Sequence, residues 1–385
     1  MRRSTVTSVL AFALAAFMPP ESSSAQQTAT DGPYKILKSA RVGGEGGTDY
    51  IYADVVGRRL YIPRGAVRAD TTSGRAAVPA RITVFNLDNL DPIGEMLTAP
   101  NSQGNGVAID PKSGHGFSSS RPAITMFDTK TLQLLKSIPI DSGVGPDGIL
   151  FDGYNDRVYV FSHPTKDATV IDSRTGTVLG RIDLGGVPEQ GVADGKGLLY
   201  VVMQDAVGSV TVVDVKTMKA TAHWTFADKG GCNGLALDDK NKVLFAACGR
   251  SGVVVGAPPP APGPQPPAVP MMVVMSAKDG AILASLPLAG GSDGAAFNPQ
   301  TMEAFSSHGN GTLTIVKEKS PTSFEVEQNL NTMNGARTIA FDSKTGRLFV
   351  MSVERGPAPP PPAGGGRGGQ APVIPGSFTV LMIGK

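Results

Sequence analysis

The sequence predicts an all-β fold, a seven-bladed β-propeller closed by pairing of an N-terminal strand with the last blade. Three observations support this: the composition, a phrase that recurs along the chain, and incomplete units at the two ends. The 385 residues include 48 glycines and 31 prolines, and aromatic residues make up only 6%. Such a composition is typical of many turns and short elements. The length is normal for a propeller.

The recurring phrase begins with glycine, a polar residue, often a second glycine, an apolar pair and aspartate. A turn, two apolar strands separated by a loop, a Thr-Gly turn and a final strand follow, as residues 145–184 show. A four-strand unit that recurs every ~40–45 residues predicts stacked propeller blades. The polar marker of the phrase falls at seven positions, 42–60 residues apart: Asp49, Asn105, Asp147, Gln190, Asn233, Asp293 and Arg337.

The two ends of the chain predict how the ring closes. Residues 377–383 match the third strand of a unit, and no fourth strand follows them. Residues 34–42 (YKILKSARV) are similar to residues 132–140 (LQLLKSIPI), which match a fourth strand. The N-terminal strand should therefore complete the last blade and cover its open edge.

The strand sequences carry a resemblance to a known family. Segments such as DRVYVFSH, GLLYVVMQD and GRLFVMSV, with turn patterns such as VIDSRTG at 170–176, resemble the YVTN-type repeats of YncE-like propellers. The resemblance implies a bacterial periplasmic or surface protein whose Tyr and Val pack between sheets and whose Asp and Gly form turns. Some such relatives bind nucleic acid. Here the net charge is only +2 and no basic stripe with aromatics is present, so no strong nucleic-acid binding is expected.

The N-terminal segment has the pattern of a secretory signal peptide. Arg2 and Arg3 precede a short apolar run at 9–18, and small residues at 23–25 offer a cleavage site. The run is about half the ~20 residues that span a bilayer, so no membrane span is expected. We expect a signal peptide at 1–25, a flexible segment at 26–33 and one monomeric propeller at 34–385, located in the periplasm or secreted.

The seven markers predict a candidate ligand-binding site. Each precedes the first strand of a unit, so all should surround one mouth of the central channel. Asp and Asn before Gly are also ordinary turn residues, which is the alternative explanation. Oxygen ligands of this kind suit a divalent metal such as Ca²⁺. His163 and His308 follow second strands at the same face and could add a transition-metal or acid–base function, although a loop histidine often has neither role.

Several sequence motifs of known catalytic and cofactor sites are missing from this sequence, and none that is present identifies the ligand. The absence of C-x-x-C-H excludes covalent haem, and no G-x-S-x-G, Walker or H-E-x-x-H motif occurs. We expect an exported scaffold that binds an unknown protein or small-molecule ligand at this top face and mouth. The alternative is a lactonase-like, metal-dependent hydrolase with a divalent ion at the mouth, and a noncovalent haem carrier is a weaker possibility.

Three units are lengthened between their second and third strands, at 64–80, 257–270 and 355–376. The last two are rich in proline and glycine, so we expect irregular loops there. They are either neutral surface loops or a lid or partner-binding segment on the mouth face. Arginines in these insertions would favour an anionic or mixed-charge ligand: Arg64, Arg68, Arg75, Arg355 and Arg367.

Cys232 and Cys248 are the only cysteines, and the export signal implies an oxidising compartment. If Leu237 pairs with Val243 across the turn between the two strands, the antiparallel ladder also places the two cysteines opposite each other. The sequence therefore predicts a disulfide, with two packed free thiols as the alternative.

Overall fold

The computed structural model describes residues 30–71, 74–100, 102–141, 143, 145–205, 207–226, 230–249, 269–357 and 371–385. The expected signal peptide and most of the two Pro/Gly-rich insertions lie outside the described residues. The described part of the chain contains strands and no helix, and therefore no helix long and apolar enough to cross a membrane.

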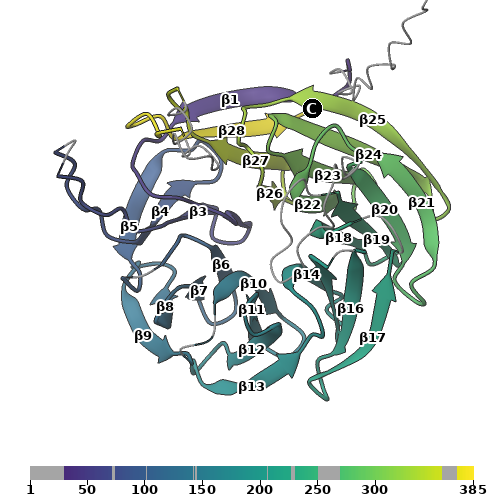
Figure 1. Cartoon of the computed structure of the whole chain (residues 1–385), viewed down its shortest axis with the longest axis horizontal. Coiled ribbons are helices and arrows are strands. Elements are labelled where there is room, and N and C mark those ends of the chain that lie inside the picture. Colours follow the sequence, from purple (N-terminus) through teal and green to yellow (C-terminus); the bar gives the residue numbers. More distant parts are fainter. Residues whose placement is uncertain are drawn as a thin grey trace, which may run out of the picture.

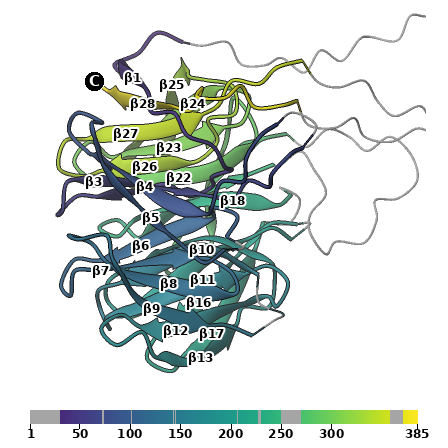
Figure 2. The same ribbon diagram turned by 90° about the vertical axis from the view of Figure 1, so that its left-hand side faces the viewer.

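The strands form seven four-stranded antiparallel sheets arranged around one axis (Figure 1). In each sheet the first strand lies toward the axis and the fourth at the rim, and the side view shows the sheets stacked as blades (Figure 2). This confirms the predicted seven-bladed propeller. Blades 1 to 3 consist of β2 (Tyr52–Asp54), β3 (Arg59–Arg64), β4 (Arg81–Asn86), β5 (Pro92–Leu97); β6 (Gly106–Asp110), β7 (His115–Ser119), β8 (Ala123–Asp128), β9 (Leu134–Pro139); and β10 (Pro146–Asp152), β11 (Arg157–Ser162), β12 (Asp167–Asp172), β13 (Val178–Asp183).

The remaining four blades follow in chain order. They consist of β14 (Pro188–Ala193), β15 (Leu198–Met203), β16 (Ser209–Asp214), β17 (Lys219–Thr225); β18 (Cys232–Asp238), β19 (Val243–Cys248), β20 (Met271–Ser276), β21 (Ile282–Pro287); β22 (Ser292–Asn298), β23 (Glu303–His308), β24 (Thr312–Ser320), β25 (Ser323–Asn331); and β26 (Ile339–Asp342), β27 (Arg347–Ser352), β28 (Thr379–Gly384) with β1 (Lys35–Arg41).

Ring closure occurs as the chain ends predicted. Strand β1 pairs antiparallel with β28, from Lys35 opposite Gly384 to Arg41 opposite Thr379, and so becomes the fourth strand of blade 7 (Figure 1). The first and last strands of the chain thus share one sheet, which removes an open edge from the last blade.

One aromatic side chain from each second strand fills each interface between blades. Seven separate buried clusters are found, and each combines residues of two neighbouring blades. The third residue of every second strand is aromatic and at most 1% exposed: Tyr61, Phe117, Tyr159, Tyr200, Phe245, Phe305 and Phe349. Burial of such rings supplies much of the hydrophobic stabilisation of a domain.

The aspartates of the repeated phrase mostly terminate strands. Asp128, at the end of β8, accepts hydrogen bonds from the backbone N–H groups of Lys130 and Thr131 at 2.9 and 2.7 Å. Asp152, at the end of β10, accepts one from the N–H of Tyr154 at 3.0 Å. These carboxylates stabilise the tight turns that follow the strands.

Cys232 and Cys248 are joined by a disulfide between β18 and β19. They lie opposite each other, but the register assumed from the sequence is wrong by one residue, because Leu237 pairs with Leu244. A β-bulge between Cys232 and Gly234 inserts one residue and brings the cysteines back into register. The predicted disulfide is therefore correct, because the bulge offsets the one-residue difference in register.

The disulfide should contribute measurably to stability. It closes a loop with a sequence separation of 16 residues. Loops of that size give ~3 kcal/mol in the chain-entropy model. We expect the variant Cys232→Ala/Cys248→Ala to lose about that amount in urea unfolding. A reductant should weaken the wild type and leave the double variant unchanged; equal sensitivity of both proteins would contradict this assignment.

Candidate functional site at the channel mouth

The register of the inner strands identifies one equivalent position in every blade. In each of blades 3 to 6 the inner strand has a bulge directly after its first paired residue. The residue that follows this first pair therefore occupies the same position in all four blades. The remaining blades place the corresponding residue just before their inner strand. The seven equivalent residues, here called the mouth ring, are Asp49, Asn105, Asp147, Glu189, Asn233, Asp293 and Arg337.

The mouth ring corrects the predicted set at one blade. The sequence placed Gln190 in the ring, but the register aligns Glu189 with Asp147, since Pro188 pairs with Met203 as Pro146 pairs with Ser162. The sequence contains evidence for Glu189, because the pair Pro-Asp at 146–147 corresponds to the pair Pro-Glu at 188–189. The prediction of Gln190 came from aligning the blades on the glycine that follows the polar residue, and in blade 4 that glycine lies one residue later.

Gln190 instead joins its own blade to the inner strands of blades 5 and 6. Its Oε1 accepts hydrogen bonds from the backbone N–H of Leu235 in blade 5 at 3.1 Å and of Ala295 in blade 6 at 3.0 Å. Its Nε2 donates to the carbonyl oxygen of Ala295 at 2.9 Å. One side chain thus ties three blades together, so Gln190 has a structural role.

The inner strands approach each other closely beneath the ring. The position equivalent to Gln190 is glycine in blades 2, 3, 5 and 6. A Cβ on Gly234 would lie 2.8 Å from the carbonyl carbon of Gly294, and one on Gly148 would lie 3.0 Å from the carbonyl oxygen of Glu189. Glycine is required at these two positions because neighbouring backbones leave no room for a side chain.

On one side of the ring, Arg337 is held between carboxylates. Its Nε lies 2.9 Å from Asp293, and its Nη2 lies 3.8 Å from Asp49. Burial lowers the pKa of Arg337, but the carboxylates of Asp293 and Asp49 outweigh this and raise it. Asn233 donates through Nδ2 to Asp293 at 2.7 Å, which links blades 5, 6, 7 and 1. Elsewhere in the ring, the amide of Asn105 donates to the carbonyl oxygen of Pro146.

On the other side, Glu189 is the most enclosed carboxylate of the ring. It is 5% exposed, and its two oxygens accept hydrogen bonds from the hydroxyl of Tyr50 and the amide of Gln204. Burial, and then the nearby carboxylates of Asp147, Asp293 and Asp49, raise the pKa of Glu189 well above its usual range. The protonated form of Glu189 is therefore favoured, beside the carboxylates of Asp147, Asp293 and Asp49.

Tyr50 spans the channel, since it precedes the inner strand of blade 1 and Glu189 belongs to blade 4, on the opposite side of the ring. Burial and the charge of Glu189 raise the pKa of Tyr50 far above its ordinary value, so the phenol stays protonated and donates. Neither Tyr50 nor Gln204 was predicted from the sequence as a residue of the mouth. Gln204 could have been predicted, because it directly follows the second strand of its blade, β15, as His163 directly follows β11.

His163 completes this side of the mouth. Its Nε2 lies 2.8 Å from Asp147 Oδ2 and 3.6 Å from Glu189 Oε1. The three potential ligand atoms lie within 4.8 Å of one another. One nitrogen and two carboxylate oxygens at such separations can hold a metal ion or exchange a proton.

His308 does not reach the mouth, and that prediction is wrong. It is the last residue of β23 and is fully buried, with Nδ1 2.9 Å from Thr312 Oγ1 and Nε2 3.1 Å from Ser306 Oγ. His163 instead lies one residue beyond the end of its strand. Because side chains alternate along a strand, this single-residue difference sends His308 into the blade. Burial lowers the pKa of His308 to about 3.

Arg64 also departs from expectation. It is fully buried, its guanidinium stacks 3.7 Å from the ring centroid of Phe378, and its Nη2 donates to the carbonyl oxygen of Gly43 at 3.0 Å. Arg64 therefore supports the loops of blades 1 and 7 and does not add charge over the mouth. Arg367 lies outside the described residues.

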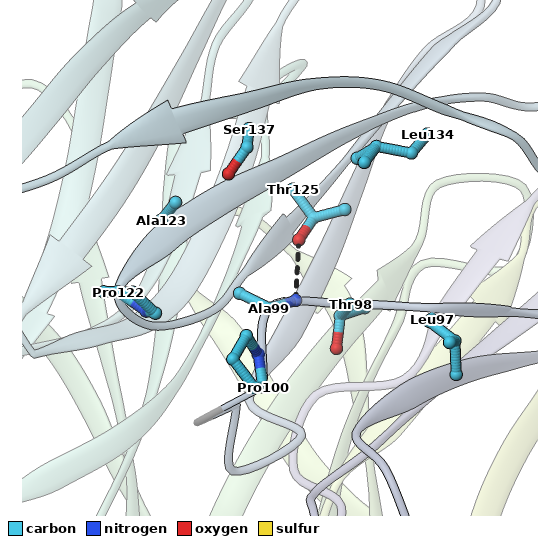
Figure 3. Close-up of a pocket in the computed structure, with 9 residues that line it drawn as sticks. All are labelled: Leu97, Thr98, Ala99, Pro100, Pro122, Ala123, Thr125, Leu134 and Ser137. Atoms are coloured by element: carbon cyan, nitrogen blue, oxygen red, sulfur yellow. Dashed lines mark hydrogen bonds between the residues drawn. The ribbon is translucent and has the colours of Figure 1, made fainter.

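A separate pocket at the rim lacks the chemistry found at the mouth. It has a volume of about 290 Å³ and lies between the outer strands of blades 1 and 2 (Figure 3). The hydroxyl of Thr125 accepts a hydrogen bond from the N–H of Ala99 at 3.1 Å there. No titratable side chain lines it; the lining residues are Leu97, Thr98, Ala99, Pro100, Pro122, Ala123, Thr125, Leu134 and Ser137.

Comparison with known proteins supports the fold and leaves the activity open. A solved structure titled Kuenenia stuttgartiensis hydrazine synthase is similar, with a TM-score of 0.62 and 13% identity, over 85% of this chain and 95% of that chain. At this identity the similarity shows the seven-bladed propeller fold alone. The chain matches no protein-family description, and no curated protein matches it in sequence.

His308 should make the protein less stable in acid. Its pKa falls from about 6.5 when unfolded to about 3 when folded, so the unfolded chain binds an extra proton between these values. The stability is complete above pH 6.5 and is lost as the pH falls toward 3, by on the order of 4 kcal/mol. We expect His308→Asn to flatten the dependence of unfolding free energy on pH between 6.5 and 4, with His223→Gln as the control. Equal slopes in all three proteins would contradict this expectation.

Gln190 should matter for stability because two backbone N–H groups depend on its oxygen. Gln190→Met keeps most of the volume and removes the acceptor. We expect a loss of about 2–4 kcal/mol in unfolding free energy, since each buried donor left unpaired costs ~1–3 kcal/mol. Gln300→Met, at a surface residue with one long hydrogen bond of 3.3 Å, is the matched control. Similar losses in both variants would refute the structural role.

Proposed function

We propose that this protein is an exported, YncE-like propeller that works as a binding scaffold and receives a positively charged ligand at its channel mouth. The observation that carries the proposal is the mouth ring itself. Seven equivalent positions present four carboxylates, two amides and one arginine at the mouth of the channel. Convergent polar groups of this kind are suited to orient a bound ligand.

The charge of the ring favours a cation. The ring holds four carboxylates, at Asp49, Asp147, Glu189 and Asp293, and a single arginine, Arg337, which lies 2.9 Å from Asp293 and 3.8 Å from Asp49. His163 lies beside Asp147 and Glu189. Negative charge collected in a partly buried site attracts and stabilises a bound cation. This differs from the anionic or mixed-charge ligand suggested by the arginines of the insertions.

Export and family are supported by sequence features. The basic residues, short apolar run and small residues at 1–25 fit a signal peptide, and the disulfide fits an oxidising compartment. The YVTN-like phrases in the second and third strands support a YncE-like ancestry. A location in the periplasm or outside the cell follows from these features as part of the proposal.

A metal-dependent hydrolase is the second candidate, favoured by the grouping of Asp147, His163 and Glu189. Three protein ligands would leave a coordination position for water or substrate. Turnover of simple lactones or esters by metal-loaded protein, abolished by Glu189→Gln, would favour this candidate over a scaffold without catalysis.

The scaffold proposal is tested with organic cations. We expect putrescine and lysine to raise the melting temperature of the wild type, since a ligand that binds only the folded state stabilises it. Acetate should have no effect. Asp49→Asn/Asp293→Asn should remove most of the response, because it neutralises two ring carboxylates.

The matched control is Asp214→Asn/Asp279→Asn, which removes the same charge from exposed turns while keeping their hydrogen-bond acceptors. No response of the wild type to either cation, or an equal response in both double variants, would count against a cation-binding mouth.

A further inference from the structure

We propose that Asp147, His163 and Glu189 form a binding site for a divalent transition-metal ion such as Zn²⁺, on the blade 3–blade 4 side of the mouth. This inference rests on the proposed function, because both take the channel mouth as the ligand-binding face. It adds a divalent metal ion as one ligand of that face. It also differs from the calcium ion that the ring oxygens alone would suggest.

The separations of the three ligand atoms fit a small metal ion. Ligand atoms of a tetrahedral zinc site, at about 2.0–2.2 Å from the metal, lie about 3.3–3.6 Å from one another. His163 Nε2 lies 2.8 Å from Asp147 Oδ2 and 3.6 Å from Glu189 Oε1. All three ligand atoms lie within 4.8 Å of one another, so a bound ion would need to draw the side chains together by rotation about their bonds.

The surroundings hold these ligands in place. Glu189 accepts hydrogen bonds from Tyr50 and Gln204, one at each carboxylate oxygen. Partners of this kind orient metal ligands and raise metal affinity. Asp147 and His163 belong to the same blade, at the start of β10 and just after β11, so a rigid sheet fixes their relative positions.

Two buried acceptors provide independent support. Gln204 is 1% exposed, and its Oε1 accepts no hydrogen bond from the described residues, although its amide donates to Glu189. Asn233 is also 1% exposed, and within the same part of the chain its Oδ1 accepts none. A buried acceptor without a donor is costly. A cation in the mouth would compensate such oxygens as well as the excess of carboxylates.

The donor set selects the class of metal. Calcium takes six to eight oxygen ligands, whereas this group supplies one imidazole nitrogen and two carboxylates. Imidazole with carboxylate suits zinc and neighbouring first-row divalent ions. Three protein ligands would leave one position of a tetrahedral ion open for a further ligand.

The test is metal binding to the purified full-length protein after treatment with a chelator and its removal. We expect isothermal titration to give about one Zn²⁺ per chain and Co²⁺ to produce the visible absorption of a tetrahedral site, with Ca²⁺ binding much more weakly. His163→Gln and Glu189→Gln should each weaken Zn²⁺ binding more than 10-fold, and Gln204→Ala by about 10–100-fold.

His223→Gln is the matched control, because His223 also lies near a carboxylate, 3.7 Å from Asp205, but outside the mouth. Circular dichroism and thermal unfolding verify that each variant folds. The inference is overturned if the folded wild type binds no Zn²⁺ or Co²⁺, or if His163→Gln and Glu189→Gln bind Zn²⁺ as the wild type does. The scaffold proposal is judged separately, by the response to putrescine and lysine.

Discussion

The packing of one aromatic ring between each pair of blades is the interaction on which the rest of the structure depends. A four-stranded sheet cannot bury both faces alone, so every blade needs two neighbours. Tyr61 fills the interface of blades 1 and 2, and Phe349 fills that of blades 7 and 1, where the chain closes on itself. Because the ring is continuous, the sheets keep a fixed tilt and the inner strands are brought together at the axis.

That convergence creates the mouth. Inner strands meet so closely that Gly148 and Gly234 have no space for a side chain, and Gln190 bonds to the backbone of blades 5 and 6. In blades 3 to 6 a bulge at the start of the inner strand places one residue at the mouth, and in blades 1, 2 and 7 the equivalent residue lies just before the inner strand. The fold thus supplies seven equivalent positions, and the residues that occupy them decide the chemistry.

The charged side chains are unevenly distributed among the seven equivalent positions at the mouth. Arg337 compensates carboxylates on the side of blades 6, 7 and 1, while blades 3 and 4 place His163 beside Asp147 and Glu189. Tyr50 connects the two sides by reaching across the axis. A site of this kind is made by substitutions at equivalent positions, which is why a common propeller fold does not define a function.

The sequence by itself determined the fold, the number of blades, the closing strand and the face on which the polar markers gather. These follow from a repeat of four alternating strands, which is a local pattern. Tertiary structure decided which side chains reach the mouth. Glu189 rather than Gln190 enters the ring because of a one-residue difference in register, and His308 turns into its blade where His163 turns outward. Tyr50 and Glu189 lie 139 residues apart in the chain and meet only across the channel. Since side-chain direction reverses with every residue of a strand, a register known only to within one residue cannot decide such contacts.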